Sequence, residues 1–294
     1  MKVLIFGSRG QLGSCLIDQL ENKDHNLVCS SHEEVDIANF EETKNYILDI
    51  SPDLIINAAA YTAVDKAEED QEEANIINHL AVANIANICC ELDCWLIHVS
   101  TDYVFDGNSK KPYTEDDKPN PQGVYGQTKL KGELAIQSSG CRHIIIRTSW
   151  VYSEYGSNFL KTVLRLGEKQ DKLNIIGDQY GCPTYAQDIA KTIVKLLPKL
   201  SLNHGYEGIY HYCGNHACSW FEFANIIFDI ASEFGFKVPK DINQIGSAYY
   251  PSLAARPKYS VLDCTKIESK FKISLSDLRA GVEGSLNRLT LSNK

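Results

Sequence analysis

The sequence of 294 residues lacks the marks of several classes of protein. It has no apolar run near the roughly 20 residues of a membrane span, and the stretch Lys2–Phe6 is too short for a signal peptide. It has no basic stripe either, and its net charge of −9 argues against nucleic acid as the main partner. We therefore expect a cytoplasmic protein that contacts neither a membrane nor nucleic acid.

The ten cysteines lack the dense spacing of a small secreted disulfide domain, so reduced thiols are expected. Four residues at the end of a predicted strand have side chains of the kind that bind zinc: His211, Cys213, His216 and Cys218. Zinc sites usually space each pair of ligands by two to four residues, whereas here a strand runs into a loop. We therefore expect no metal site.

Residues 2–21 have the pattern of a phosphate-binding unit. Lys2–Phe6 is a continuous apolar run, as in a parallel strand buried on both faces, and Gln11–Glu21 has the spacing of an amphipathic helix. Between and within them stand Gly7, Gly10 and Gly13, spaced G-x-x-G-x-x-G. Glycines allow close backbone approach, and a helix N-terminus supplies free N–H groups, so this turn is predicted to hold a phosphate.

The predicted second strand, Leu27–Ser31, bears on the choice of cofactor. Its end is where a site that prefers NAD carries Asp or Glu for the ribose 2′-hydroxyl, and serines stand there instead. No carboxylate is there to repel a 2′-phosphate, although no arginine is present to demand one. We expect NADPH, with NADH left open. Asp36 and Ile37 are candidate adenine contacts, and Asp36 is equally suited to cap the helix predicted over Asn39–Ile50.

Two further buried runs, Asp53–Asn57 and Trp95–Val99, are predicted strands that end in small or polar residues. Small residues let a cofactor lie against the backbone, and ligands of open α/β sheets bind beyond the carboxyl ends of the strands. Thr101 therefore lies on the side of the sheet where chemistry is expected.

Tyr125 and Lys129 stand four residues apart in a predicted helix, which puts a phenol and an ammonium on one face. A free phenol titrates near pH ~10, so a tyrosine that acts as an acid or base near neutrality needs a cation that favours the phenolate. Lys129 is placed to be that cation. The spacing alone is common, and an exposed helix pair without chemical function is the alternative.

Up to about residue 150 the predicted strands and helices alternate as in a Rossmann-type, doubly wound parallel sheet, so the fold class is α/β. The later helices, near 158–168, 186–197 and 220–234, and short strands near 173–176 and 208–212 predict a smaller α+β region. We expect residues 1–150 to bind the dinucleotide and residues 151–294 to bind mainly substrate. The last sheet strands could come from the later part.

In combination, these motifs resemble the extended short-chain dehydrogenase/reductases that act on nucleotide sugars, and among them the dTDP-4-dehydrorhamnose reductases. The resemblance extends in order from residue 3 to about residue 263. It rests on the glycine turn, Asn57–Asp65, Ser100–Gly107, Tyr125-x-x-x-Lys129, Arg147–Tyr152, Asp178–Thr184, Ala255–Pro257 and Ser260.

The resemblance implies reduction of the C4 keto group of dTDP-4-dehydro-6-deoxy-L-mannose to dTDP-L-rhamnose, a step of polysaccharide biosynthesis. Thr101 would hydrogen-bond the reacting oxygen, Tyr125 would deliver a proton, and Lys129 would tune Tyr125 and hold the nicotinamide ribose. The implied substrate contacts are Asp102, Tyr103, Trp150 and, for the diphosphate, Arg256. The implied cofactor contacts are Gly7, Gly10, Gln11, Leu12, Gly13, Ser31, Asp36, Ile37, Ala60, Tyr61, Thr62, Val99, Tyr125 and Lys129. Trp150 as plain core and Arg256 as a surface ion pair are the alternatives.

Some members of the family form a dimer through magnesium held by carboxylates on two helices. The matching positions here are Cys15, Gln187 and Asp188, which leave too few oxygen ligands for magnesium. We expect a monomer, or a dimer that magnesium does not bridge.

Four rival functions share the fold. A nucleotide-sugar dehydratase would resemble its relatives in carrying Asp-Glu after the threonine, whereas Tyr103 follows Asp102 here. An epimerase or another nucleotide-sugar 4-ketoreductase stays open. A non-catalytic regulatory subunit would be expected to lose Thr101, Tyr125, Lys129 or the glycines, all of which are present.

Overall fold

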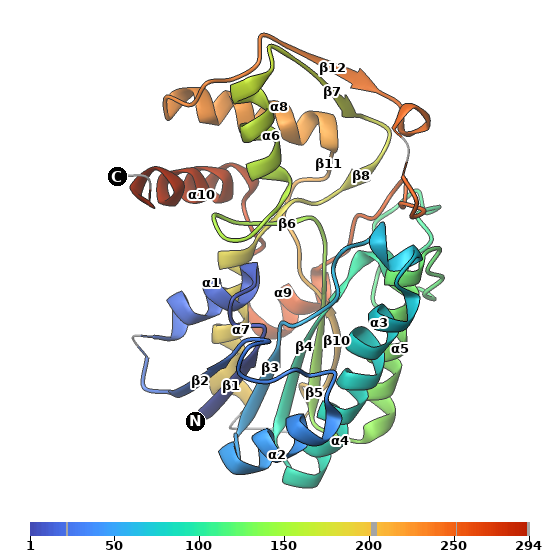
Figure 1. Cartoon of the computed structure of the whole chain (residues 1–294), viewed down its shortest axis with the longest axis vertical. Coiled ribbons are helices and arrows are strands. Elements are labelled where there is room, and N and C mark those ends of the chain that lie inside the picture. Colours follow the sequence, from blue (N-terminus) through green and yellow to red (C-terminus); the bar gives the residue numbers. More distant parts are fainter. Residues whose placement is uncertain (22, 201–204, 251, 293–294) are drawn as a thin grey trace.

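A parallel sheet of six strands forms the centre of the computed structural model, which describes residues 1–21, 23–200, 205–250 and 252–292. In spatial order the strands are β10 (Gly208–His211), β5 (His143–Thr148), β4 (Trp95–Thr101), β3 (Leu54–Asn57), β1 (Lys2–Phe6) and β2 (Asn26–Ser30). Their carboxyl ends all point toward a smaller region, which lies at the top of Figure 1.

Helices cover both faces of the sheet, as predicted for a doubly wound fold. One face packs against α1 (Gln11–Leu20), α7 (Ala186–Leu200) and α9 (Thr265–Phe271), and the other against α2 (Phe40–Ile50), α4 (Ala81–Leu92) and α5 (Val124–Ser139). Side chains of a strand alternate between the faces. Val3 and Ile5 therefore belong to the first core, and Leu4 and Phe6 belong to the second.

The order of the strands places a ligand crevice between β1 and β3. From β1 the chain runs through α1 to β2 at one edge, and it then returns through α2 to β3 on the other side of β1. The direction of winding reverses at this point, and ligands of open α/β sheets bind at such a switch point.

The helical segment over residues 71–92 is not regular throughout. It consists of α3 (Gln71–Asn75), a π-helical turn over Ile76–Leu80, and α4. Asn78 in the π turn accepts a hydrogen bond from the backbone N–H of Tyr61 and donates one to the carbonyl of the same residue. The turn thereby anchors the loop that follows β3.

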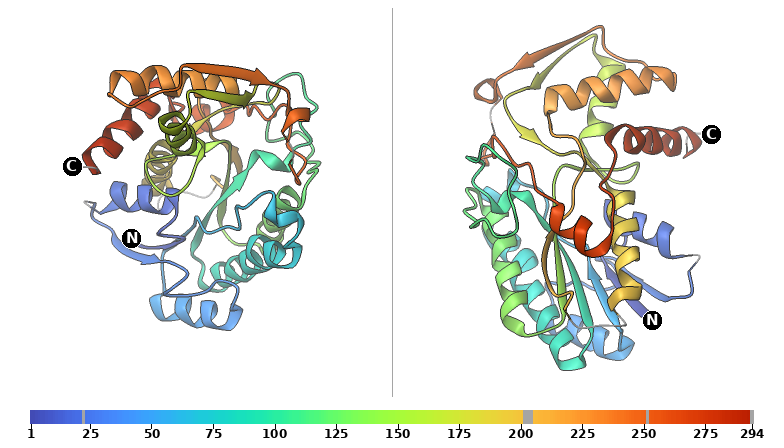
Figure 2. Two further views of the ribbon diagram at one scale, coloured as in Figure 1. Left: turned by 45° about the horizontal axis from the view of Figure 1, so that its top comes forward. Right: turned by 180° about the vertical axis from the view of Figure 1, so that it is seen from behind.

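The smaller region has its own apolar core. It contains α6 (Phe159–Lys169), α8 (Trp220–Glu233) and α10 (Leu278–Ser292), together with the parallel pair β7 (Lys172–Ile176) and β12 (Asp241–Ile245). Shorter pairs join it to the rest: β6 (Val151–Tyr152) with β9 (Thr184–Tyr185), and β8 (Tyr180–Gly181) with β11 (Cys218–Ser219). Figure 2 shows this region above the carboxyl edge of the sheet.

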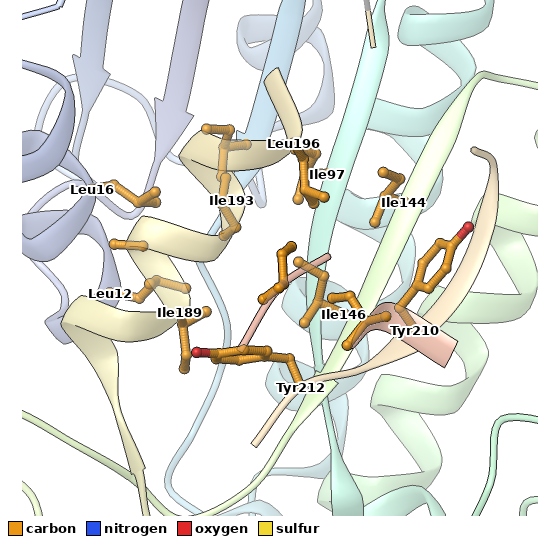
Figure 3. Close-up of a cluster of buried hydrophobic side chains, with 14 of the residues drawn as sticks. Leu12, Leu16, Ile97, Ile144, Ile146, Ile189, Ile193, Leu196, Tyr210 and Tyr212 are labelled. Atoms are coloured by element: carbon orange, nitrogen blue, oxygen red, sulfur yellow. The ribbon is translucent and has the colours of Figure 1, made fainter. Parts of the chain in front are cut away.

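Two later segments return to the sheet. Strand β10 pairs with β5, and α7 packs against α1 (Figure 1). Figure 3 shows the shared core, in which Leu12 and Leu16 of α1 face Ile189 and Ile193 of α7. After residue 150 the chain thus passes more than once between the smaller region and the sheet. The division into a dinucleotide-binding part up to residue 150 and a substrate-binding part after it stays a prediction.

His211, one of the four residues with side chains of the kind that bind zinc, is buried and bonds through Nδ1 to the carbonyl oxygen of Tyr113 at 3.1 Å. Within the described ranges, no cluster of three histidine, cysteine or acidic residues is arranged to hold a metal ion. None of the described helices is long and apolar enough to span a bilayer.

Candidate active site

A cavity of about 950 Å³ opens at the carboxyl edge of the sheet. It is lined by the glycine turn after β1, the ends of β3, β4 and β5, the start of α5, and side chains of the smaller region. The predicted site residues that line it are Gly7, Gly10, Gln11, Leu12, Ser31, Asp36, Ile37, Ala60, Thr62, Val99, Thr101, Asp102, Tyr103, Tyr125, Lys129, Trp150 and Arg256. Gly13 and Tyr61 are not among the lining residues.

The glycine turn fits a dinucleotide phosphate. Gly7 has a φ of +78°, and a Cβ there would lie 2.7 Å from the backbone nitrogen of Ala59, so only glycine fits between the strand ends. Gly10 is the N-cap of α1 and offers no side chain to the first N–H groups of the helix. Those groups remain available for an anion at the positive end of the helix dipole.

Of the predicted cofactor contacts that follow β2 and β3, Asp36 lines the cavity and Tyr61 does not. Asp36 lines the cavity, and its Oδ1 accepts a hydrogen bond from the N–H of Ala38 at 3.0 Å. The alternative role of Asp36 as the cap of α2 is wrong, because Asn39 is the cap and accepts from the N–H of Glu42. Tyr61 turns its phenol away to Asp70, at 3.1 Å.

Tyr125 and Thr101 meet on the opposite wall. A Cβ at Gly126 would lie 2.2 Å from the carbonyl oxygen of Tyr103, so glycine lets α5 approach the end of β4 closely. Burial raises the pKa of the Tyr125 phenol above its usual value, while a hydrogen bond with Thr101 acts in the opposite direction. The phenol is therefore neutral near pH 7 and carries the proton that a ketone reduction needs.

Lys129 is buried one turn further along α5. Its Nζ donates to the carbonyl oxygen of Val99 at 2.7 Å and lies 3.1 Å from Nε2 of His98. Burial lowers the pKa of Lys129 to about 8, although the carboxylate of Glu133 acts in the opposite direction. The shift of the Tyr125 pKa is upward and comes from burial, so tuning of the phenol by Lys129 stays a prediction.

Asp102 offers the cavity a buried acceptor. Its Oδ1 accepts from the hydroxyl of Thr101 at 3.0 Å, and Oδ2 has no partner within 3.5 Å among the described residues, although the hydroxyl of Ser260 also interacts with the carboxyl and lowers its pKa. Burial raises the pKa of Asp102 to about 6. An oxygen of this kind suits a hydroxyl donor on a sugar.

Arg256 lines the cavity and also forms an ion pair. Its Nη2 donates to Asp65 at 2.6 Å, and its Nε donates to the hydroxyl of Ser252 at 3.2 Å. Asp65 also accepts from the N–H of Ala254 at 3.1 Å, which ties this loop to the segment after β3. The ion-pair interpretation is confirmed, and the guanidinium still has N–H groups for an anionic ligand.

Comparison with known proteins agrees with this arrangement. The family model described as RmlD substrate binding domain matches residues 1–291. A curated dTDP-4-dehydrorhamnose reductase from Sinorhizobium fredii is 38% identical over 296 residues, which cover 100% of this chain and 99% of that protein. The chain belongs to the dTDP-4-dehydrorhamnose reductase family.

Solved structures of the family share the whole fold. A dTDP-4-dehydrorhamnose reductase from Clostridium acetobutylicum is 34% identical and superposes with a TM-score of 0.92, covering 99% of this chain and 100% of that one. The enzyme from Bacillus anthracis, solved in complex with NADP, is 33% identical with a TM-score of 0.89 and covers 100% and 99%.

Sequence reasoning missed two charged residues of this family member near the end of β2. Glu34 folds back so that its Oε2 accepts from both the N–H and the hydroxyl of Ser31, which places a carboxylate where none was expected. Arg9, from the glycine turn, lines the same end of the cavity and pairs with Glu33. The expectation that no arginine stands at this end of the cavity was therefore wrong, whereas Glu34 bonds to Ser31 without being one of the lining residues.

Trp220 was also missed. It begins α8, and its indole stacks on that of Trp150 with ring centroids 3.4 Å apart and an interplanar angle of 4°. Both rings line the cavity, and Trp150 has a φ of +48°, in the left-handed region. The available signal was the capping box of Ser219 and Glu222, which marks the start of a helix. Trp220 is the first residue of that helix.

Proposed function

We propose that this chain reduces the C4 keto group of dTDP-4-dehydro-6-deoxy-L-mannose to dTDP-L-rhamnose with NADPH. One observation carries the proposal: Thr101, Tyr125 and Lys129 line the same cavity as the phosphate-binding glycine turn. Membership of the family gives the substrate class, and the NADP complex of the Bacillus anthracis enzyme supports the cofactor.

The chain's own residues act on the oxygen of the keto group. Bound NADPH supplies a hydride for C4. The hydroxyl of Tyr125 is a donor held in place for the oxyanion, and the hydroxyl of Thr101 joins it by turning its single proton from Asp102 to that oxygen. Donors positioned in this way favour the transition state over the ground state. Tyr125 gives its proton to that oxygen, and burial keeps the phenol protonated until it does so.

The remaining predicted contacts divide into those that would bind the dinucleotide and those that would bind the sugar nucleotide. Residues 1–150 would bind the dinucleotide, and residues 151–294 would contribute mainly to substrate binding. Asp102, Tyr103 and Trp150 would contact the sugar nucleotide, while the planar guanidinium of Arg256 would bind its diphosphate. Trp220 extends this set, because its ring covers that of Trp150.

We also propose that magnesium does not bridge two copies. Burial raises the pKa of the Cys15 thiol, which disfavours the thiolate that binds metals. Gln187 donates to Asp18 at 2.6 Å, and Asp188 accepts from Ser276 and Lys191. Nucleotide sugars and free thiols both suit the cytoplasm, which is the location we propose.

The test is oxidation of NADPH by the purified protein in the presence of the dTDP-4-keto sugar, with NADH in a parallel assay. Stoichiometric oxidation with dTDP-L-rhamnose as product supports the proposal. An epimerase would change the sugar without net oxidation, and a regulatory subunit would show no turnover.

The variant Tyr125→Phe tests the proton donor. We expect kcat to fall by roughly 10² to 10⁴, the usual contribution of general acid catalysis, with NADPH binding retained. Unchanged turnover would refute the role of Tyr125 and leave the fold assignment intact.

A further inference from the structure

A row of three buried polar side chains leads from β3 to the candidate active site. Nδ2 of Asn57 lies 3.2 Å from Nδ1 of His98, and Nε2 of His98 lies 3.1 Å from Nζ of Lys129. The three residues are exposed by only 1%, 0% and 1%. Polar groups buried to this degree are held by their hydrogen bonds, so the direction of each bond has consequences.

The backbone fixes the direction of the first bond. The N–H of Ala59 donates to Oδ1 of Asn57 at 3.1 Å, so Oδ1 is the acceptor on that side of the amide. The NH₂ group of Asn57 therefore faces His98 and donates to Nδ1. Because a neutral imidazole carries one proton, the proton of His98 is on Nε2.

The Nε2–H group of His98 then points at the lysine nitrogen. An ammonium has three donors and no lone pair, whereas a neutral amine can accept this hydrogen bond. The tautomer of His98 therefore favours the neutral form of Lys129. The carbonyl of Val99 accepts an N–H from either form and does not discriminate between them.

The other charged groups near Lys129 oppose this preference only weakly. Glu133, one turn further along α5, favours the ammonium, but its carboxylate is already bonded to Arg147 and to Ser100. Burial lowers the pKa of Lys129 to about 8 and also lowers the pKa of His98 well below its usual value, so His98 is neutral at pH 7.

We propose that Asn57 and His98 are positioning residues that set the protonation of Lys129 through the tautomer of His98. The lysine then changes its charge close to neutral pH instead of staying an ammonium throughout. The consequence for turnover rests on the proposed function together with the role that the family resemblance implies for Lys129, whose ammonium would tune Tyr125. Turnover then falls as the pH rises through the pKa of Lys129.

Asn57→Asp should reverse the direction of both hydrogen bonds of His98, and the side chain keeps almost the same shape. The introduced carboxylate still accepts from the N–H of Ala59, and it accepts from Nδ1–H of His98 instead of donating to it. The lone pair of Nε2 then faces Lys129 and accepts from the ammonium. The pKa of Lys129 should rise by about one unit or more, because the hydrogen bond now favours the charged form.

The primary readout is the pH titration of Lys129 by NMR of ¹³Cε-labelled lysine, assigned with Lys129→Met. We expect Lys129 to titrate with a pKa of about 8 in the native protein, and its acidity to be at least tenfold weaker in Asn57→Asp. Titration at the ordinary value near ~10.4 in the native protein, or no change in Asn57→Asp, would overturn the proposal.

Two controls separate the tautomer from simple charge. Asn174→Asp adds the same charge at an exposed position of β7 and should leave the titration of Lys129 unchanged. Combined with His98→Leu, Asn57→Asp should lose its effect, since a coupling through His98 appears as non-additivity in a double-mutant cycle. A shift that persists without His98 would show direct charge attraction and contradict the proposal.

The pH profile of kcat/KM separates this proposal from the proposed function. If the basic limb of the kcat/KM profile shifts to higher pH together with the pKa of Lys129 in Asn57→Asp, the positioning proposal and the proposed function are both supported. If Lys129 titrates as expected but the profile does not follow, the positioning pair stands and the catalytic role of Lys129 fails.

Discussion

Nη1 of Arg9, which lines the same end of the cavity as Ser31, lies 2.5 Å from Oε2 of Glu33. Both side chains are mostly exposed, at 63% and 70%, so the pair is weak and its separation costs little. Arg9 is thus available for a 2′-phosphate, while the carboxylate of Glu34 beside it suits a 2′-hydroxyl. The two residues favour opposite cofactors.

Arg9→Gln should therefore weaken use of NADPH more than use of NADH. We expect kcat/KM with NADPH to fall roughly tenfold, about 1.4 kcal/mol, with a smaller loss for NADH. Glu33→Gln removes the ion-pair partner of Arg9 and should therefore raise kcat/KM with NADPH. Calorimetric binding of 2′,5′-ADP checks the assignment without turnover, and equal losses with both cofactors would contradict it.

Asp102→Asn should stabilise the fold at neutral pH while it weakens substrate binding. Burial raises the pKa of Asp102 to about 6, above its value in the unfolded chain, so the fold loses stability as the pH rises from ~4 through 6. The gain in Asp102→Asn should be about 3 kcal/mol near pH ~7.5 and should vanish below pH ~4. Urea unfolding at both pH values measures it; a gain independent of pH would count against this cause.

Glu133→Gln should destabilise the protein far more than a comparable change at the surface. Glu133 and Arg147 form a fully buried pair with Nη2 and Oε2 2.7 Å apart. Loss of one partner leaves an uncompensated buried charge, which typically costs about 3–5 kcal/mol. The control is Glu91→Gln, which breaks an exposed pair with Lys44 and should cost less than ~1 kcal/mol. Similar unfolding free energies for both variants would refute the expectation.

Chelation should not change the mass of the protein in solution. Arg288 donates to Asp18 and lies 3.2 Å from Glu154, so a guanidinium already neutralises the carboxylates between α1 and α10. Light scattering with and without EDTA should give the same mass. A dimer that dissociates in EDTA would show that magnesium does bridge two copies.

The sequence predicted the elements whose pattern is local. The strand Lys2–Phe6 is confirmed because a continuous apolar run is typical of a strand buried on both faces, and the helix predicted from Gln11 ends at Leu20. Thr101 could be placed at the carboxyl edge because parallel strands share that edge, whereas Tyr125 and Lys129 stand on α5 and were assigned to the site by the family resemblance.

The remaining features depend on contacts between distant segments. Strand β10 joins β5 from the far half of the chain, which periodicity cannot specify. Asn78 in the π turn bonds to Tyr61, and Trp220 lines the cavity with its ring stacked on that of Trp150, so both contacts join separate segments of the chain. Arg9 and Glu34 lay outside the expected pattern because their side chains fold back across a turn.

The most direct test of the account follows the hydride itself. NADPH deuterated at C4 of the nicotinamide is incubated with the protein and the dTDP-4-keto sugar, and the product is analysed by NMR. The account predicts net oxidation of NADPH and deuterium at C4 of dTDP-L-rhamnose, both strongly reduced in Tyr125→Phe. A sugar that changes configuration without net oxidation, or a product without deuterium at C4, would contradict it.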